Sequence, residues 1–172
     1  MNIGPEQNIE VLEGDTCPFC LNKSLNLKQA EREVKDYGVL ILLSMSCQKE
    51  DCGYYKMDFE SEPEKKAYKE TLDVESLGML DKEVIVSSQA TVKIPRLGAL
   101  EPSETSNGYI TTVGGILKRF KRLQEELRDS SEDKSEKKKA KNAIKKLTKV
   151  LFGHESIKIS IVDKTGVSKF LG

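Results

Sequence analysis

The sequence CPFC at residues 17–20 and the sequence CQKEDC at residues 47–52 decide the fold of the N-terminal part of this chain. Together they contain the four cysteines of a 172-residue protein, in two pairs with 26 residues between them. A tetrahedral zinc ion takes four such ligands from two tight turns. The second pair spans a wider loop, which still lets both thiolates face one ion. The spacing predicts one structural Zn²⁺ ion, with the ligands Cys17, Cys20, Cys47 and Cys52.

Two other uses of the cysteines fit the sequence less well. Two disulfides would require an oxidising compartment, and the N-terminus shows neither the basic nor the apolar region of a secretory signal. A redox site would use Cys17 and Cys20 but leave Cys47 and Cys52 without a role. A zinc site with four protein ligands is closed to water, so we expect it to stabilise the fold and not to hydrolyse a substrate.

The segments around the cysteines predict a zinc ribbon of about three antiparallel strands. Residues 25–34 lead into a turn at Asp36-Tyr37-Gly38, and residues 39–46 return from it. Tyr55, Met57 and Phe59 then alternate with polar residues, as in a strand. A module this short cannot fold on apolar burial alone, so the metal is expected to hold it together.

A charged stretch with Pro63 predicts a module boundary after residue 60. The zinc ribbon is therefore expected at residues 1–60, and a β module at residues 61–172. The fold class predicted for the whole chain is α+β, mostly β.

The second module combines short strands with two helices. Apolar alternation predicts strands at residues 83–88 and 90–95, and a further short strand at residues 109–112. Two amphipathic segments with a short polar link predict an antiparallel helical hairpin at about residues 113–152. Strand patterns on either side of a turn with Gly166 predict a terminal β-hairpin. The helix faces expected to be buried consist of Val113, Ile116, Leu117, Phe120, Leu123 and Leu127, and of Ala140, Ala143, Ile144, Leu147, Val150 and Leu151.

Charge is distributed unevenly, although 28 basic and 28 acidic residues cancel in total. Residues 1–75 contain nine Lys and Arg against sixteen Asp and Glu, and residues 118–149 contain thirteen against six. The zero net charge excludes a basic nucleic-acid binder as a description of the whole chain. The uneven distribution predicts an oriented surface for a charged partner, unless the basic face is simply solvated. The longest apolar run, residues 39–43, is far shorter than a membrane span of about 20 residues. We therefore expect a cytoplasmic protein without membrane contact.

Three motifs in the second module, in chain order, resemble the ZPR zinc-finger protein family. They are VIVSSQATVKIPRL at residues 84–97, GYITTVGGIL at residues 108–117 and IVDKTGVS at residues 161–168. With the cysteine pairs, they make the chain similar to a single-copy, archaeal-type member. The chain departs from the family pattern in its wider second cysteine loop, and at Arg96 and Gly114, where the family usually has Glu. Eukaryotic members carry two tandem copies, whereas this chain has no internal repeat.

The resemblance implies a fold and a function. The implied fold is a zinc ribbon beside a module that resembles a double-stranded β-helix with an inserted helical hairpin. Eukaryotic members bind the translation elongation factor that carries aminoacyl-tRNA and help it to fold. The resemblance therefore implies a non-enzymatic, zinc-binding partner protein that acts as a folding factor or regulator of this GTPase. The family match gives the candidate contact positions, which alternatively serve as turn and capping residues: Ser88, Thr91, Arg96, Thr111, Thr112 and Gly115.

An RNA-binding zinc-ribbon protein is the alternative, with the Lys-rich hairpin on phosphate groups. RNA binding favours aromatic side chains that stack on bases. Phe120 and Phe152 are the aromatic residues of this region, and both fit the buried helix faces. An enzyme is not expected, because the sequence shows neither an open metal position nor a nucleophile paired with a base.

Overall fold

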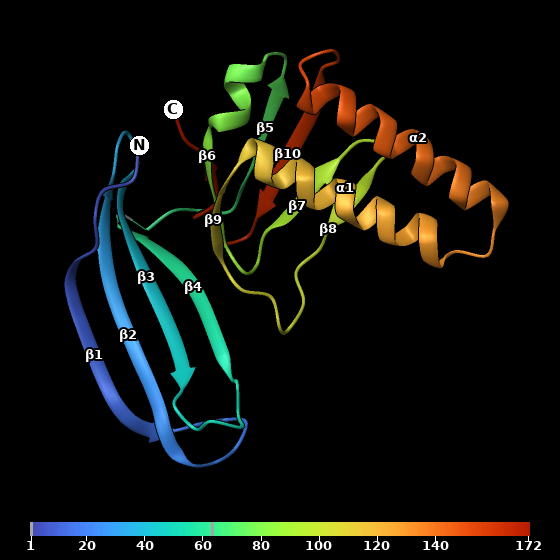
Figure 1. Ribbon diagram of the computed structural model, residues 1–172. Coiled ribbons are helices and arrows are strands. Elements are labelled where there is room, and N and C mark those ends of the chain that lie inside the picture. Colours follow the sequence, from blue (N-terminus) through green and yellow to red (C-terminus); the bar gives the residue numbers. More distant parts are fainter. Residues whose placement is uncertain (1, 63) are drawn as a thin grey trace.

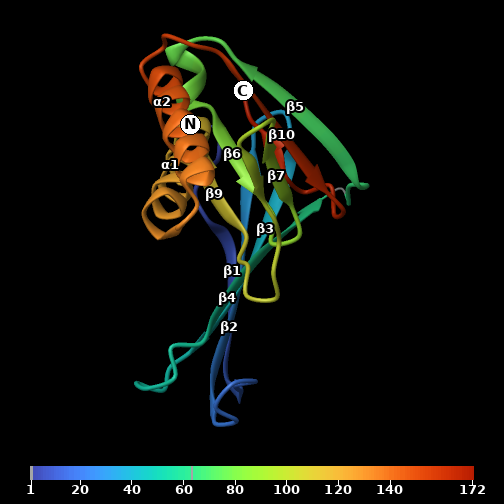
Figure 2. The ribbon, with the colours of Figure 1, turned by 90° about the vertical axis from the view of Figure 1, so that its right-hand side faces the viewer.

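The computed structural model shown in Figure 1 describes residues 2–62 and 64–172. A long four-stranded sheet lies beside a body of two shorter sheets and two helices. Figure 2 shows that one end of the long sheet projects away from this body. The fold is mostly β with two helices, as predicted. Pro63 lies outside the described residues, and the module boundary predicted there stays a prediction.

The N-terminal sheet is antiparallel, and its strands follow one another in chain order. They are β1 (Gln7–Thr16), β2 (Lys23–Val34), β3 (Gly38–Cys47) and β4 (Tyr55–Glu62). The strand pair around Asp36-Tyr37-Gly38 and the strand from Tyr55 are confirmed. The expected number of three strands is one too few. The sequence does not predict β1 because this strand is exposed along its whole length, so no buried face imposes alternation on it.

The body contains two antiparallel sheets and a 3-10 helix, η1 (Leu77–Asp81). One sheet has the order β5-β10-β7-β8, and the other has the order β11-β6-β9. The predicted terminal β-hairpin is wrong, because β10 pairs with β5 and β7, whereas β11 pairs with β6 in the other sheet. The strands are β5 (Tyr68–Val74), β6 (Glu83–Val86), β7 (Thr91–Ile94), β8 (Gly98–Leu100), β9 (Tyr109–Thr112), β10 (Ile157–Asp163) and β11 (Lys169–Phe170).

A buried carboxylate explains why the chain changes sheets after β10. Asp163 accepts hydrogen bonds from the backbone N–H groups of Thr165 and Ser168, both at 2.8 Å, and from the hydroxyl groups of the same two residues. Burial alone would raise the pKa of Asp163, but these hydrogen bonds outweigh burial and lower it. The bonds close a compact turn that directs the chain away from β10 and into the second sheet.

Strand β6 joins the two parts of the molecule because both of its faces are buried. Val84 and Val86 belong to a core that contains residues of both body sheets and both helices. Ile85 packs into a second core with Leu40 of β3 and Phe59 of β4. This second core holds the N-terminal sheet against the body. It also explains the unbroken apolar run at residues 84–86, since alternation arises only where one face of a strand is exposed.

The two helices, α1 (Val113–Ser130) and α2 (Lys134–Leu151), form the predicted hairpin and cover the body on one side (Figure 1). Gly153, with φ of 75°, follows the end of α2 in the left-handed conformation that commonly ends a helix. Part of the predicted buried face is wrong, because Leu123 and Leu127 are 40% and 42% exposed. Figure 1 shows the reason: the hairpin continues past β7 and β8, so no sheet lies beneath its distal end.

Neither helix is long and apolar enough to span a membrane, within residues 2–62 and 64–172.

Candidate metal centre

The four cysteines meet at the projecting end of the N-terminal sheet. The loop between β1 and β2 carries Cys17 and Cys20, while Cys47 ends β3 and Cys52 lies in the loop before β4. In an antiparallel sheet these two loops lie at the same end, and the pairing of Leu25 with Cys47 brings them side by side (Figure 1). Cys20 and Cys47, which have 26 residues between them in the sequence, therefore become neighbours through one strand pair.

The distances between the sulfur atoms match a tetrahedral metal site. All four Sγ atoms lie within 4.8 Å of one another. Cys17 Sγ lies 3.8 Å from Cys52 Sγ, and Cys20 Sγ lies 3.7 Å from Cys47 Sγ. Four sulfur atoms about 2.3 Å from a central zinc ion are about 3.8 Å apart, whereas a disulfide needs about 2.05 Å. The arrangement therefore fits a thiolate-bound ion, and none of the four cysteines forms a disulfide.

Backbone hydrogen bonds hold each loop in shape. In the first loop, the N–H of Cys17 donates to the carbonyl of Asn22 at 2.8 Å, and the N–H of Leu21 donates to the carbonyl of Cys17 at 2.9 Å. In the second, the N–H of Cys47 donates to the carbonyl of Tyr54 at 2.9 Å, and Cys52 donates to Lys49 at 3.1 Å. The wider second loop therefore still places both of its sulfur atoms within the four-cysteine cluster.

The local electrostatics favour a bound cation. Hydrogen bonds from Asn22 lower the pKa of the Cys20 thiol to about 6, and a contact of 3.1 Å with the Ser24 hydroxyl lowers the pKa of Cys47. Burial raises the pKa of Cys52 to about 12, and the neighbouring thiols add to this. Four thiolates this close together repel one another unless a cation lies between them. A soft divalent ion such as zinc, held by Cys17, Cys20, Cys47 and Cys52, would supply that charge, and its binding would require the remaining thiols to lose their protons.

Leu21 is strained in the first loop. Its φ is 60°, and the corresponding residue of the second loop is Gly53, with φ of 64°. The side chain of Leu21 is 76% exposed, so it contributes little to packing. We expect Leu21→Gly to stabilise the metal-loaded protein by about 0.5–1 kcal/mol. Relief of left-handed strain is worth about 1–2 kcal/mol, and the extra flexibility of glycine in the unfolded chain costs about 0.5–1 kcal/mol of this gain.

Urea unfolding of the metal-loaded protein measures this difference. Phe19→Gly is a matched control, because Phe19 is equally exposed, at 74%, and lies in the same loop without a positive φ. The control should lose stability. Equal losses in both variants would contradict the strain at Leu21.

Three of the candidate contact positions lie together where β9 enters α1. The hydroxyl of Thr112 caps the helix by accepting a hydrogen bond of 3.1 Å from the N–H of Gly115. A side chain on Gly115 would overlap the hydroxyl of Thr111. Thr112 and Gly115 therefore act as capping residues, the alternative that the sequence leaves open, and any role in binding stays a prediction.

The other three candidate positions, Ser88, Thr91 and Arg96, have different structural roles. Ser88 is buried, and both its N–H and its hydroxyl donate to the carboxylate of Asp58 on β4. Thr91 lies in β7, where it pairs with Val162. Arg96 is exposed, with φ of 66°, in the turn between β7 and β8. The structure does not gather the six positions into one site.

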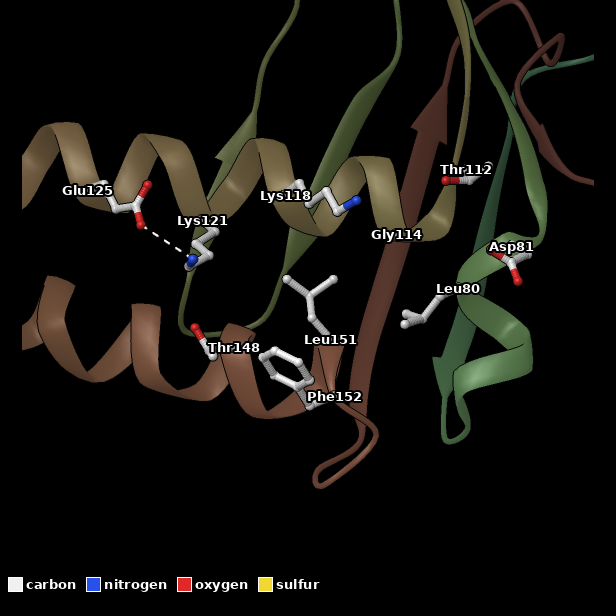
Figure 3. Close-up of a pocket in the computed structure, with 10 residues that line it drawn as sticks. All are labelled: Leu80, Asp81, Thr112, Gly114, Lys118, Lys121, Glu125, Thr148, Leu151 and Phe152. Atoms are coloured by element: carbon white, nitrogen blue, oxygen red, sulfur yellow. Dashed lines mark ion pairs between the residues drawn. The ribbon is translucent and has the colours of Figure 1, made fainter.

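A groove of about 530 Å³ lies between α1, α2 and η1 (Figure 3). Its apolar walls come from Leu80, Leu151 and Phe152, and Lys121 pairs with Glu125 along one side at 3.5 Å. The expectation that Phe152 is buried is wrong. It follows the last residue of α2, where the chain turns away from the body, and it is 67% exposed. Helical periodicity does not hold beyond the end of a helix, so the sequence pattern could not place it.

These features define a zinc-finger type of protein, in which four cysteines close one metal site on a sheet joined to a mostly β body. The sequence matches the family model of the ZPR1 jelly-roll domain over residues 78–170. The chain therefore belongs to the ZPR1 family, and its body is a jelly-roll domain.

Relatives span archaea and animals. A ZPR1-like protein of Methanocaldococcus jannaschii is 27% identical over 168 residues, which cover 96% of this chain and 82% of the relative. A ZPR1-like protein of Pyrococcus horikoshii is 25% identical over 98% of this chain and 76% of the relative. The zinc finger protein ZPR1 of Drosophila melanogaster is 27% identical over 120 residues, which cover 68% of this chain and 26% of the relative.

Proposed function

We propose that this chain is a cytoplasmic, zinc-binding partner protein that acts as a folding factor or regulator of the translation elongation factor that carries aminoacyl-tRNA. Membership of the ZPR1 family supports this role, since the motifs at residues 84–97, 108–117 and 161–168 resemble those of members that bind this GTPase. The observation that carries the proposal is the four-cysteine cluster, which holds together a sheet end that projects away from the body (Figure 2).

We also propose the identity of the metal ion, the type of its module and the type of the body. One Zn²⁺ ion is bound by Cys17, Cys20, Cys47 and Cys52, and it makes the projecting end a zinc ribbon. The two sheets of the body correspond to a double-stranded β-helix. The ion has a structural role, because four protein ligands leave no position for substrate or water.

A binding role fits the side chains that would otherwise suggest catalysis. Ser88 is engaged with Asp58, and Ser87 is buried with its hydroxyl accepting from the N–H of Gln89. His154 is exposed after the end of α2. It is the one histidine of the chain, and Ser87 and Ser88 have the other hydrogen-bond partners just named. We therefore propose that the protein is not an enzyme.

The charge distribution gives such a protein two distinct faces. The hairpin of α1 and α2 presents exposed basic residues, among them Lys118, Arg119, Lys145 and Lys146. The first 75 residues carry the excess of acidic residues. A partner with its own separated charges would bind in one orientation, and its association would slow as salt increases.

A capture experiment tests the proposed function. Tagged protein is incubated with native lysate of its source organism, with and without nuclease, and the retained proteins are identified. We expect the elongation factor to remain bound after nuclease treatment. In a second step, purified protein should increase the fraction of denatured elongation factor that regains nucleotide binding. Retention of RNA-linked proteins alone, and their release by nuclease, would refute the partner role.

RNA binding through the hairpin is the second candidate function. One observation favours it, although the sequence predicts no exposed aromatic residue in this region. Phe152 is exposed near Lys149, so an aromatic ring is available beside basic residues after all. In that case the logarithm of the affinity for RNA falls linearly with the logarithm of the salt concentration. Phe152→Ala would then weaken RNA binding, whereas it would leave retention of the elongation factor unchanged.

A further inference from the structure

We propose that the free edge of β1 binds a short, basic, extended segment of a partner protein as an additional strand. Within the described residues, β1 is an edge strand whose ladder runs along β2 alone. All ten of its residues are exposed, and Figure 1 shows no other element on its outer side. The unpaired backbone N–H and C=O groups of such an edge can bond to an incoming strand.

Two irregularities limit the usable edge to residues 9–13. Asn8 and Gly14 have φ values of 47° and 77°. The register with β2 shifts near each of them, whereas Glu10, Val11 and Leu12 follow one another in regular register. Bulges twist an edge strand and end its pairing. The regular segment between them is therefore suited to a short strand and not to a long ribbon.

The side chains of this segment indicate a surface that is covered by a partner. Ile9, Val11 and Leu12 are 54%, 53% and 61% exposed, although each is a large aliphatic residue. Lys and Pro, which commonly protect free edges, are absent from β1, and its register shifts lie outside residues 10–12. Water-exposed aliphatic residues along such an edge lose their contact with water when a strand is added.

Charge determines which partner this edge accepts. Glu10 and Glu13 are the charged residues of the segment, and neither forms an ion pair with any described residue. A second copy of this chain would bring further carboxylates to the edge and no cation, and like charges on paired strands repel. A partner strand with Lys or Arg opposite these positions gains two ion pairs instead.

The positions of these residues define the sequence of the partner strand. In antiparallel pairing, the residues opposite Glu13, Leu12, Val11, Glu10 and Ile9 would be basic, apolar, apolar, basic and apolar. Glu10 and Glu13 lie three residues apart and so on opposite faces of the sheet. The complementary segment therefore has two basic residues with two aliphatic residues between them, and a third aliphatic residue after them.

Three labelled heptapeptides test this inference by fluorescence anisotropy. The first, TKVVKVT, has the complementary pattern. The second, TEVVEVT, reverses its charge. The third, TKVPKVT, keeps the charge but contains a proline, whose fixed φ and missing N–H group disfavour pairing as a regular strand. We expect the first peptide to bind at least tenfold more tightly than either of the others. We also expect it to slow amide hydrogen exchange at residues 9–13, which simple charge attraction would not do.

Variants of the protein provide the matched comparison. Glu10→Lys combined with Glu13→Lys should reverse the preference, so that TEVVEVT binds more tightly than TKVVKVT. Tyr55→Lys is the control, because Tyr55 is 52% exposed on β4, the opposite edge strand, and this change should leave the preference intact. These charge variants replace exposed side chains, and the proline peptide requires no change to the protein at all.

Several outcomes would overturn the inference. Equal binding of the Lys and proline peptides would show attraction without strand addition. Slowed exchange elsewhere than β1 would place the site on another surface. Sedimentation that shows a dimer, dissociated by the double Lys variant or by changes at Val11, would make a second copy the occupant. Undetectable binding of TKVVKVT to the wild-type protein would also refute it.

Discussion

Removal of the metal from the four-cysteine cluster is expected to unfold the projecting end of the N-terminal sheet while the body stays folded. Metal binding in small four-ligand modules contributes about 10–16 kcal/mol at neutral pH. The projecting end has few buried side chains of its own, namely Cys17 and Leu25. The other end of the sheet differs, because Leu40 and Phe59 pack in a core shared with the body. Unfolding should therefore start at the cysteine loops and decrease towards that core.

Hydrogen exchange measured before and after chelation tests this expectation. Amides of the cysteine loops and of the adjoining ends of β2 and β3 should exchange far faster without metal, whereas amides of α1 and α2 serve as an internal control and should not change. Adding Co²⁺ should restore protection and give the absorption of a tetrahedral thiolate site. Cys52→Ser should have the effect of chelation. Unchanged exchange and unchanged circular dichroism after complete metal removal would refute a structural role for the ion.

Gly166→Ala is expected to destabilise the body by about 1.5–4 kcal/mol. The new methyl group would overlap the backbone carbonyl of Lys66, and Gly166 has φ of 73°. Overpacking against a rigid group costs about 1–3 kcal/mol. A left-handed conformation costs an alanine about 1–2 kcal/mol, of which its lower flexibility in the unfolded chain offsets about 0.5–1 kcal/mol. The turn cannot easily move aside, because the buried carboxylate of Asp163 accepts hydrogen bonds from both sides of Gly166.

Gly14→Ala separates the cost of overpacking from the cost of the left-handed backbone conformation. Gly14 has a similar φ of 77°, but no atom lies within 4 Å of the position that its methyl group would take. This variant should lose only the conformational part, about 0.5–1 kcal/mol, because the lower flexibility of alanine in the unfolded chain offsets part of the left-handed strain. Urea unfolding followed by circular dichroism measures both variants. Equal losses would mean that the chain around Lys66 moves aside and that the close approach has no energetic cost.

The metal site could be predicted from the sequence because its information is local. Each cysteine pair lies within one turn, and the strand pattern between Leu25 and Ser46 brings the two turns together. The cap of α1 at Thr112 and the glycine after α2 are local features of the same kind. Their stabilising bonds join residues a few positions apart, so the order of residues alone specifies them.

Predictions failed where long-range packing decides the outcome. The two strands around Gly166 have the pattern of a hairpin, yet β10 and β11 pair with different sheets because the Asp163 turn redirects the chain. Leu123 and Phe152 fit the apolar face of a helix, yet both are exposed because no neighbouring element covers them. Periodicity shows which residues could share a face, but not whether anything lies against that face.

By itself, the sequence determined the cysteine cluster, the two helices with their ends, and the mostly β class of this ZPR1-family protein. Only the tertiary structure decided that β6 is buried on both faces, that β1 is a free edge, and that the end with the cysteine cluster projects from the body. The physical reason is the range of the interactions. Turns, caps and paired thiols depend on neighbours along the chain, whereas burial and edge exposure depend on which distant segments pack together.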